Sequence, residues 1–166
     1  MTNEELQQQI ERLEQEIIDL KLKYAESKVD KKPYEVEVPE DIGDYYFVSE
    51  LGVITLLKDV FFSAGYEKLY QRGLAFKTKE EAEQFDKERV LINKLKNWAE
   101  EHNGGWTPNW NDNDAKYYVE YEYGRFLIKY NSNNRTFTKL PYFKSEELAR
   151  EFIDEFRDEI IEVLCQ

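Results

Sequence analysis

The chain has 166 residues, of which 41% are hydrophobic and 15% aromatic, and this is enough apolar material for one folded domain with an extension. Its 35 acidic residues outnumber its 23 basic residues, and the resulting net charge of −12 disfavours direct binding to nucleic acid or to anionic membranes. No apolar run is long enough to span a membrane, the acidic N-terminus lacks a secretory signal, and the one cysteine, Cys165, excludes an internal disulfide. These features predict a cytoplasmic protein.

The first 32 residues predict a helix with a heptad seam. Apolar residues recur at alternating spacings of four and three, which places isoleucine at the a positions and leucine at the d positions. The predicted dimerisation residues are Leu6, Ile10, Leu13, Ile17 and Leu20. This pattern favours a two-stranded coiled coil and hence a homodimer, although the flanking charges suit a parallel or an antiparallel pair. An ordinary amphipathic helix packed on its own domain is the alternative interpretation.

The rest of the chain shows an internal repeat of two similar units. Residues 45–52 align with residues 117–124, and residues 76–85 align with residues 143–152. Each copy predicts a short antiparallel β-meander followed by a capped helix, so we expect two tandem βββα units at 33–105 and 106–166. The predicted fold is therefore α+β, an N-terminal coiled-coil helix followed by these two units. In the second copy, the predicted strands cover residues 117–123, 126–130 and 136–143.

The most distinctive charge pattern is on the last predicted helix. Acidic residues recur there at spacings of three and four, which aligns them in a stripe beside the apolar face. The predicted partner-binding residues are Glu147, Glu151, Asp154, Glu155, Asp158 and Glu162, together with Glu35 and Glu37 on one face of a predicted strand at 34–38. Such a ladder of carboxylates can compete with nucleic-acid phosphates for a basic groove on another protein. A solvated helix face that keeps the protein soluble is the alternative.

Little in the sequence indicates catalysis, a cofactor or a metal. The one histidine, His102, lies in the last turn of a predicted helix, and no nucleotide-binding or zinc-binding motif is present. Asn109, Asn111, Asn113 and Glu120 have the spacing of an EF-hand calcium loop, but position 1 is not Asp and position 6 is Asp114 rather than Gly. The tyrosine-rich strands lack the basic groove that a single-stranded nucleic-acid platform needs. We therefore expect no catalytic residue, cofactor or metal site.

Several of these segments together resemble a known group of proteins. The segments are Leu74-Ala75-Phe76-Lys77-Thr78, Tyr117-Tyr118-Val119-Glu120-Tyr121 and Phe143-Lys144-Ser145-Glu146-Glu147-Leu148-Ala149. Over about residues 45–164 the chain resembles small acidic proteins encoded by phages and prophages of Firmicutes. Similar small acidic phage proteins include inhibitors of bacterial immunity, among them anti-CRISPR proteins that act on Cas9. The resemblance thus implies a host-defence protein as partner, in the cytoplasm of a bacterial host cell.

Two functions follow from these patterns together with the phage origin that the resemblance implies. The first is a non-catalytic, phage-encoded inhibitor that blocks a basic nucleic-acid-binding groove with an acidic surface. The alternative is a structural or adaptor phage protein that binds its partner through the N-terminal coiled coil.

Overall fold

The structure is a computed structural model that describes residues 3–27, 34–60 and 65–165. The chain divides into two compact units, residues 1–37 and residues 38–166. The described residues form a mixed α+β protein with an N-terminal helix and small antiparallel sheets, as the sequence predicts at this level. The predicted boundary between residues 32 and 33 lies outside the described residues.

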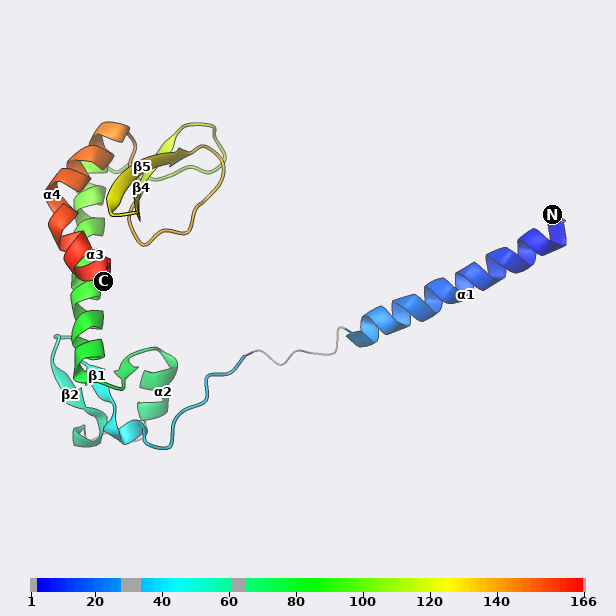
Figure 1. Ribbon diagram of the computed structural model, residues 1–166, viewed down its shortest axis with the longest axis horizontal. Helices are drawn as coiled ribbons and strands as arrows, with labels where there is room; N and C mark the ends of the chain where they lie inside the picture. Colours follow the sequence, from blue (N-terminus) through cyan, green and yellow to red (C-terminus); the bar gives the residue numbers. More distant parts are fainter. Residues whose placement is uncertain (1–2, 28–33, 61–64, 166) are drawn as a thin grey trace. The chain divides into compact units, whose positions relative to one another are not determined.

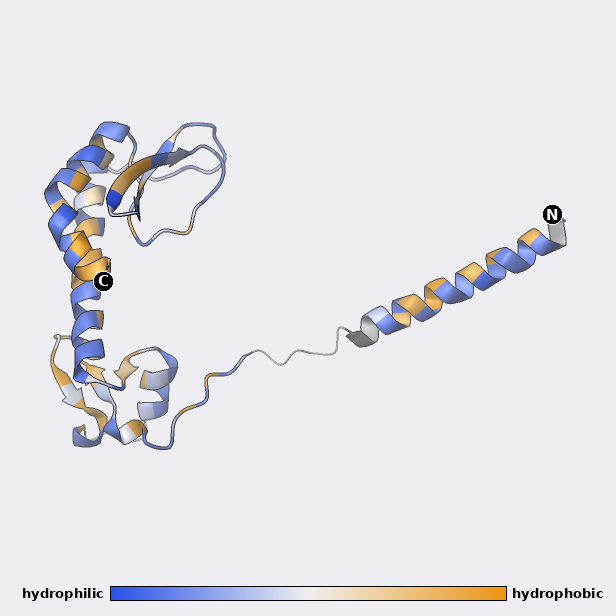
Figure 2. Ribbon diagram, viewed as in Figure 1, coloured by the Kyte–Doolittle hydropathy of each residue, from blue (hydrophilic) through white to orange (hydrophobic). Residues whose placement is uncertain are grey.

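The described part of the first unit is mostly the helix α1, Asn3–Ser27. Its apolar residues recur along the whole helix, as Figure 2 shows. The segment that follows, residues 34–38, is not a strand, so the predicted strand there is wrong. The alternation of valine and glutamate suits a strand, but a strand also needs a neighbour for its backbone hydrogen bonds, and no described segment supplies one.

The second unit begins with a small three-stranded sheet. Strands β1 (Tyr46–Val48), β2 (Ile54–Leu56) and β3 (Ala75–Phe76) are ordered β2-β1-β3, all antiparallel. Between β2 and β3 the chain forms the short helix α2, Tyr66–Gln71, so this sheet is not the simple meander expected. The 3₁₀ turns Ile42–Asp44 and Leu57–Asp59 flank the first two strands.

Helix α3, Lys79–Asn103, contacts both halves of this unit (Figure 1). It begins at a capping box, in which the Thr78 hydroxyl accepts from the Glu81 N–H at 3.1 Å and Glu81 accepts from the Thr78 N–H at 3.3 Å. It ends at Gly104 in the left-handed conformation, with φ of 62°. Its N-terminal half packs on β1 and β3, and its C-terminal half packs on the last helix.

The second sheet has two strands among the described residues, β4 (Lys116–Glu122) and β5 (Arg125–Asn131), joined by a two-residue turn. Tyr123 and Gly124 both have positive φ, 51° and 77°, as a type I′ hairpin turn requires. The third predicted strand, 136–143, is wrong: this segment makes one bridge, Tyr117 to Phe143, and is otherwise irregular. Pro141 cannot donate to a ladder, and a hydrogen-bonded loop replaces the strand.

Helix α4, Glu146–Leu164, closes the core of this half. Its apolar face packs against α3 and β4, as its periodicity predicts. The buried cluster consists of Leu91, Leu95, Ala99, Val119, Phe143, Ala149, Phe152, Phe156 and Ile160. No helix among the described residues is long and apolar enough to cross a lipid bilayer.

Candidate functional site

The predicted acidic stripe lies on α4 and faces solvent, because the opposite side of the helix is buried in the core. Five carboxylates form what we call the acidic face: Glu147, Glu151, Asp154, Asp158 and Glu162. All five side chains are exposed. Neighbours three and four apart on a helix stand roughly 5–6 Å apart at Cβ, so the charges form a continuous row.

The N-terminal cap of α4 lowers the pKa of Glu147, the first of these carboxylates. The Ser145 hydroxyl accepts from the Leu148 N–H at 3.3 Å and caps the helix. The pKa of Glu147 is lowered by a hydrogen bond from its own backbone N–H and by the Ser145 hydroxyl, with Arg150 assisting. Glu147 is therefore charged and partly engaged by the helix terminus.

Two further acids of α4 are exposed but also contact α3. Glu155, a predicted partner-binding residue, accepts a hydrogen bond from the Trp98 indole N–H at 2.9 Å. Glu159 forms an ion pair with Lys94 at 2.7 Å. These contacts attach α4 to α3, so Glu155 has a structural partner already.

The centre of the acidic face has no such partners. No ion pair within the described part of the chain involves Glu151, Asp154 or Asp158. The two bases of α4 are engaged elsewhere: Arg150 pairs with Glu146 at 2.7 Å, and the Arg157 guanidinium lies 5.9 Å from the centre of the Phe126 ring. The negative charge of these three carboxylates is thus uncompensated.

A groove of about 370 Å³ borders the acidic face on the side of β5. Its charged lining residues are Arg125, Arg150 and Arg157, together with Glu146 and Asp154. On this side the acidic face is therefore bordered by basic as well as acidic side chains. The basic side chains confine the region of negative potential to the helix surface.

Glu35 and Glu37, the other two predicted partner-binding acids, are exposed but lie in the first compact unit. Because α4 belongs to the second unit, the predicted acidic surface is split between two bodies. The strand that was to align their side chains is absent from residues 34–38.

The heptad seam of α1 is solvent-exposed along its whole length. The exposed fractions of its side chains are 40% for Leu6, 55% for Ile10, 53% for Leu13, 50% for Ile17 and 64% for Leu20. Ile18 and Leu22, next to the seam, are 50% and 57% exposed. A row of apolar side chains this long is typical of an interaction surface, because isolated helices gain little stability in water without packing.

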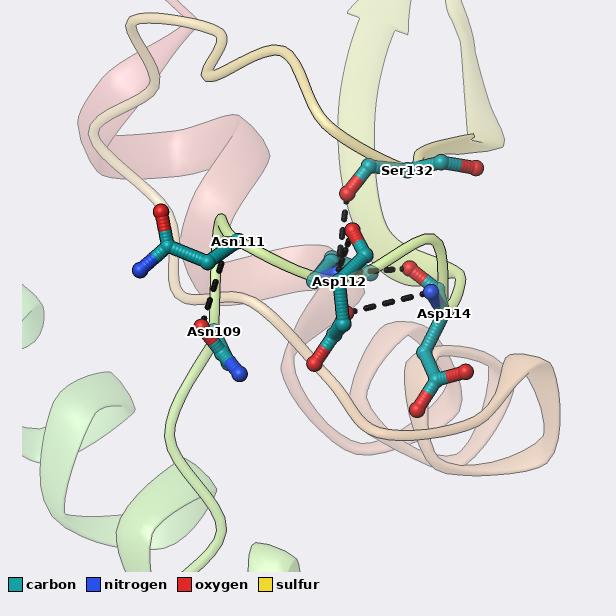
Figure 3. Close-up of polar contacts among 6 residues, drawn as sticks. Asn109, Asn111, Asp112, Asp114 and Ser132 are labelled. Carbon is teal, nitrogen blue, oxygen red and sulfur yellow. Dashed lines mark hydrogen bonds and ion pairs between the residues drawn. The ribbon is translucent and has the colours of Figure 1, made fainter.

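Next to the residues with EF-hand spacing, Asp112, Asp114 and Ser132 lie close together (Figure 3), and they bind the ammonium of Lys116. The Lys116 side chain is 1% exposed, and its ammonium donates to the Asp112 carboxylate, to the Asp114 carbonyl at 2.8 Å and to the Ser132 carbonyl at 2.8 Å. Asp112 also accepts from the Asp114 N–H at 3.1 Å, and its pKa is lowered chiefly by the hydrogen bond from Lys116. None of these oxygens belongs to the four residues with EF-hand spacing: Asn109 accepts instead from the Asn111 N–H at 3.1 Å, and Glu120 pairs with Lys129.

Sequence reasoning missed Lys116. Lys116 and Tyr118 are two residues apart and therefore lie on the same side of β4, where both are buried, but nothing in the sequence marks a lysine as buried. That side of the strand is covered by Trp110, whose ring lies 5.9 Å from the Lys116 ammonium, and by Tyr142, which packs on Tyr118.

The remaining chemistry-bearing residues are structurally engaged. His102 stacks on Trp98 with ring centres 3.8 Å apart, and its Nδ1 lies 2.8 Å from the Trp98 carbonyl oxygen. Burial raises the pKa of the Cys165 thiol, which disfavours the reactive thiolate. Within the described residues no group of three histidine, cysteine or acidic side chains could hold a metal ion.

No protein-family model matches this chain, and comparison with curated proteins and with solved structures finds no match.

Proposed function

We propose that the protein is a non-catalytic inhibitor that binds a basic, nucleic-acid-binding groove of a bacterial defence protein, as an anti-CRISPR protein acting on a Cas9-type effector does. The observation that carries this proposal is the uncompensated centre of the acidic face, Glu151, Asp154 and Asp158. A phosphate backbone presents a similar row of negative charges to such a groove. The phage origin that the sequence resemblance implies is part of the proposal.

The physics of this recognition is electrostatic. A basic groove evolved for nucleic acid attracts a row of carboxylates and speeds their encounter, and screening by salt weakens both effects. The net charge of −12 keeps the acidic face itself from binding nucleic acid, because like charges repel. Competition for the groove therefore requires no reaction centre.

In this proposal the protein acts as a homodimer that pairs through α1. Isoleucine at Ile10 and Ile17 with leucine at Leu6, Leu13 and Leu20 suits a two-stranded coiled coil. The seam is left uncovered by the rest of the described part of the first unit, so its apolar side chains are available for such pairing.

The proposed internal duplication has support at matching positions. Gly52 and Gly124 both adopt positive φ, 78° and 77°, in the turn after the first strand of each sheet. Thr78 and Ser145 both cap the helix that follows, each accepting from a backbone N–H three residues on. We propose that the two halves derive from one βββα unit whose third strand is replaced in the second copy.

The test is inhibition of DNA cleavage by a guide-loaded Cas9-type nuclease. The variant carries Glu151→Lys, Asp154→Lys and Asp158→Lys. We expect its half-inhibitory concentration to rise by at least about tenfold, because each reversal replaces attraction by repulsion. Inhibition by the native protein should also weaken when salt shortens the Debye length from about 10 Å at 0.1 M to about 3 Å at 1 M.

The matched control reverses three exposed acids outside the acidic face, Glu50, Glu100 and Glu101, and changes the net charge equally. This control should inhibit like the native protein. Equal loss in both variants would mean that net charge, not this face, is responsible. Full inhibition by the first variant would reject the proposal.

The exposed seam of α1 favours a second candidate, a structural or adaptor phage protein that binds its partner through α1. Replacing Ile10 and Ile17 with lysine separates the two functions. Loss of partner binding with an unchanged acidic face supports the adaptor, whereas retained inhibition supports the first proposal.

A further inference from the structure

A cavity of about 670 Å³ lies between α3 and the irregular loop 135–142. This volume is within the range of small-ligand pockets, about 300–1,000 Å³. Its lining combines apolar side chains, including Ile92 and Leu140, with a few polar and charged groups, which is the usual composition of such pockets. Neither proposed function uses this cavity.

The charged residues that line this cavity are all basic: Lys96 from α3, and Arg135 and Lys139 from the loop. Lys139 pairs at the rim with Glu88 at 3.2 Å. Lys96 and Arg135 form no ion pair with any described residue. Acidic residues outnumber basic residues in this chain, yet the pocket holds two basic side chains without an ion-pair partner among the described residues. Such a local positive charge favours an anionic ligand.

The loop that carries two of these cations is held in place by hydrogen bonds. The Tyr142 hydroxyl donates to the Thr136 carbonyl at 2.9 Å and accepts from the Thr136 N–H at 3.0 Å. Asn131 donates to the Thr136 hydroxyl at 2.5 Å. Tyr142 is itself fixed, because its carbonyl accepts from the buried Asn103 side chain at 2.9 Å. The pocket wall is therefore preorganised, which lowers the entropic cost of binding.

The same loop presents an aromatic ring to solvent. Phe137 lines the cavity, and its side chain is fully exposed, at 102% of the reference area. An uncovered ring on a loop whose neighbouring residues are hydrogen-bonded offers a face on which a nucleobase can stack.

We propose that this pocket binds a nucleoside phosphate, with the phosphate held by Lys96 and Arg135, Lys139 at the rim and the base on Phe137. A free nucleotide and a nucleotide within a single strand present this same chemistry. The proposal does not depend on the proposed inhibitory function, because the pocket and the acidic face share no residue.

The test measures binding to the full chain by calorimetry. Adenosine 5′-monophosphate, inorganic phosphate, adenosine and a six-nucleotide adenosine strand are titrated in turn. We expect the monophosphate to bind at least about tenfold more tightly than phosphate or adenosine alone, since each supplies one of the two contacts. Tighter binding of the strand identifies a strand as the source, and binding of the monophosphate without the strand identifies a free nucleotide.

Variants assign the contacts to residues. Lys96→Gln and Arg135→Gln should each weaken monophosphate binding about tenfold or more, and Phe137→Ala about fivefold or more. Tyr142→Phe should also weaken binding, as a positioning residue, with no change in charge. Lys87→Gln is the matched control, an exposed lysine of α3 outside the pocket, and should bind like the native protein.

Any of three results overturns the proposal. One is no detectable binding of the monophosphate or the strand. A second is binding that the Lys96 and Arg135 variants leave unchanged, provided that their far-ultraviolet circular dichroism matches the native protein. The third is equal binding of inorganic phosphate or of a poly-glutamate peptide, which would indicate an unspecific anion site.

Discussion

Lys116 is the residue on which the 106–132 region is organised. Its ammonium donates hydrogen bonds to oxygens of Asp112, Asp114 and Ser132. These bonds connect the linker before β4 to the loop after β5. A buried ammonium is stable only where hydrogen bonds and a counter-charge replace its hydration, and both are present here. The linker is therefore an ordered part of the fold.

Replacing Lys116 with methionine should test this role. The change keeps the length of the side chain but leaves the carbonyls of Asp114 and Ser132 without their donor. We expect a loss of about 1–3 kcal/mol in the free energy of unfolding, measured by urea denaturation. Lys58→Met, which breaks an exposed ion pair with Asp44, should cost much less. Equal losses would show that the buried contacts contribute nothing special.

The lowered pKa of Asp112 predicts a pH dependence. A carboxyl whose pKa is lower in the folded state binds protons more weakly there than in the unfolded chain. Its contribution to stability is present above the ordinary carboxyl pKa and is lost as the pH falls through the lowered value. The difference in unfolding free energy between the native protein and Asp112→Asn should therefore shrink as the pH falls from 7 to 2. A difference that stays constant would contradict this prediction.

At the scale of elements, the caps are the most predictable feature. The capping box at Thr78 and Glu81 and the cap at Ser145 follow directly from local sequence, because their hydrogen bonds join residues three apart. Long amphipathic helices follow equally well, since their apolar periodicity fixes both their type and their buried face.

Thr78→Ala should lower the stability of the protein by removing the cap of α3. We expect a cost of about 1 kcal/mol, or roughly 2–4 °C in the melting temperature of a protein of this size. Thr107→Ala, an exposed threonine outside helices and strands, is the control and should leave the melting temperature unchanged. A similar shift in both variants would argue that the cap is not responsible.

Strands were less predictable than helices, for a physical reason. A strand is stable only with a partner, and local sequence does not say which segment will supply one. Residues 136–143 contain threonine and aromatic residues, which are typical of strands, yet Tyr142 and Thr136 hydrogen-bond within the loop instead. The segment containing Glu35 and Glu37 fails in the same way.

The candidate surface was predictable only in part. Helical spacing places Glu151, Asp154 and Asp158 on one exposed face, and the structure has them there. Spacing could not reveal that Glu155 and Glu159 contact Trp98 and Lys94, because those contacts depend on how α4 packs on α3.

At the scale of the whole molecule, the division into two units makes a prediction about α1. Deleting residues 1–32 should leave the melting temperature of the remainder within about 2 °C, because the core lies wholly in the second unit. The same deletion should convert a dimer to a monomer in sedimentation equilibrium. A full-length monomer would contradict the proposed coiled coil, and a large drop in melting temperature would show that α1 packs on the core.

The exposed seam of α1 affects how inhibition depends on protein concentration. If two chains pair through this seam, each assembly carries two copies of the second unit, and the second contact with a two-site target becomes intramolecular. Avidity then adds to the affinity of one copy and disappears on dilution below the dissociation constant of the pair. Potency would fall more steeply with dilution than single-site binding allows.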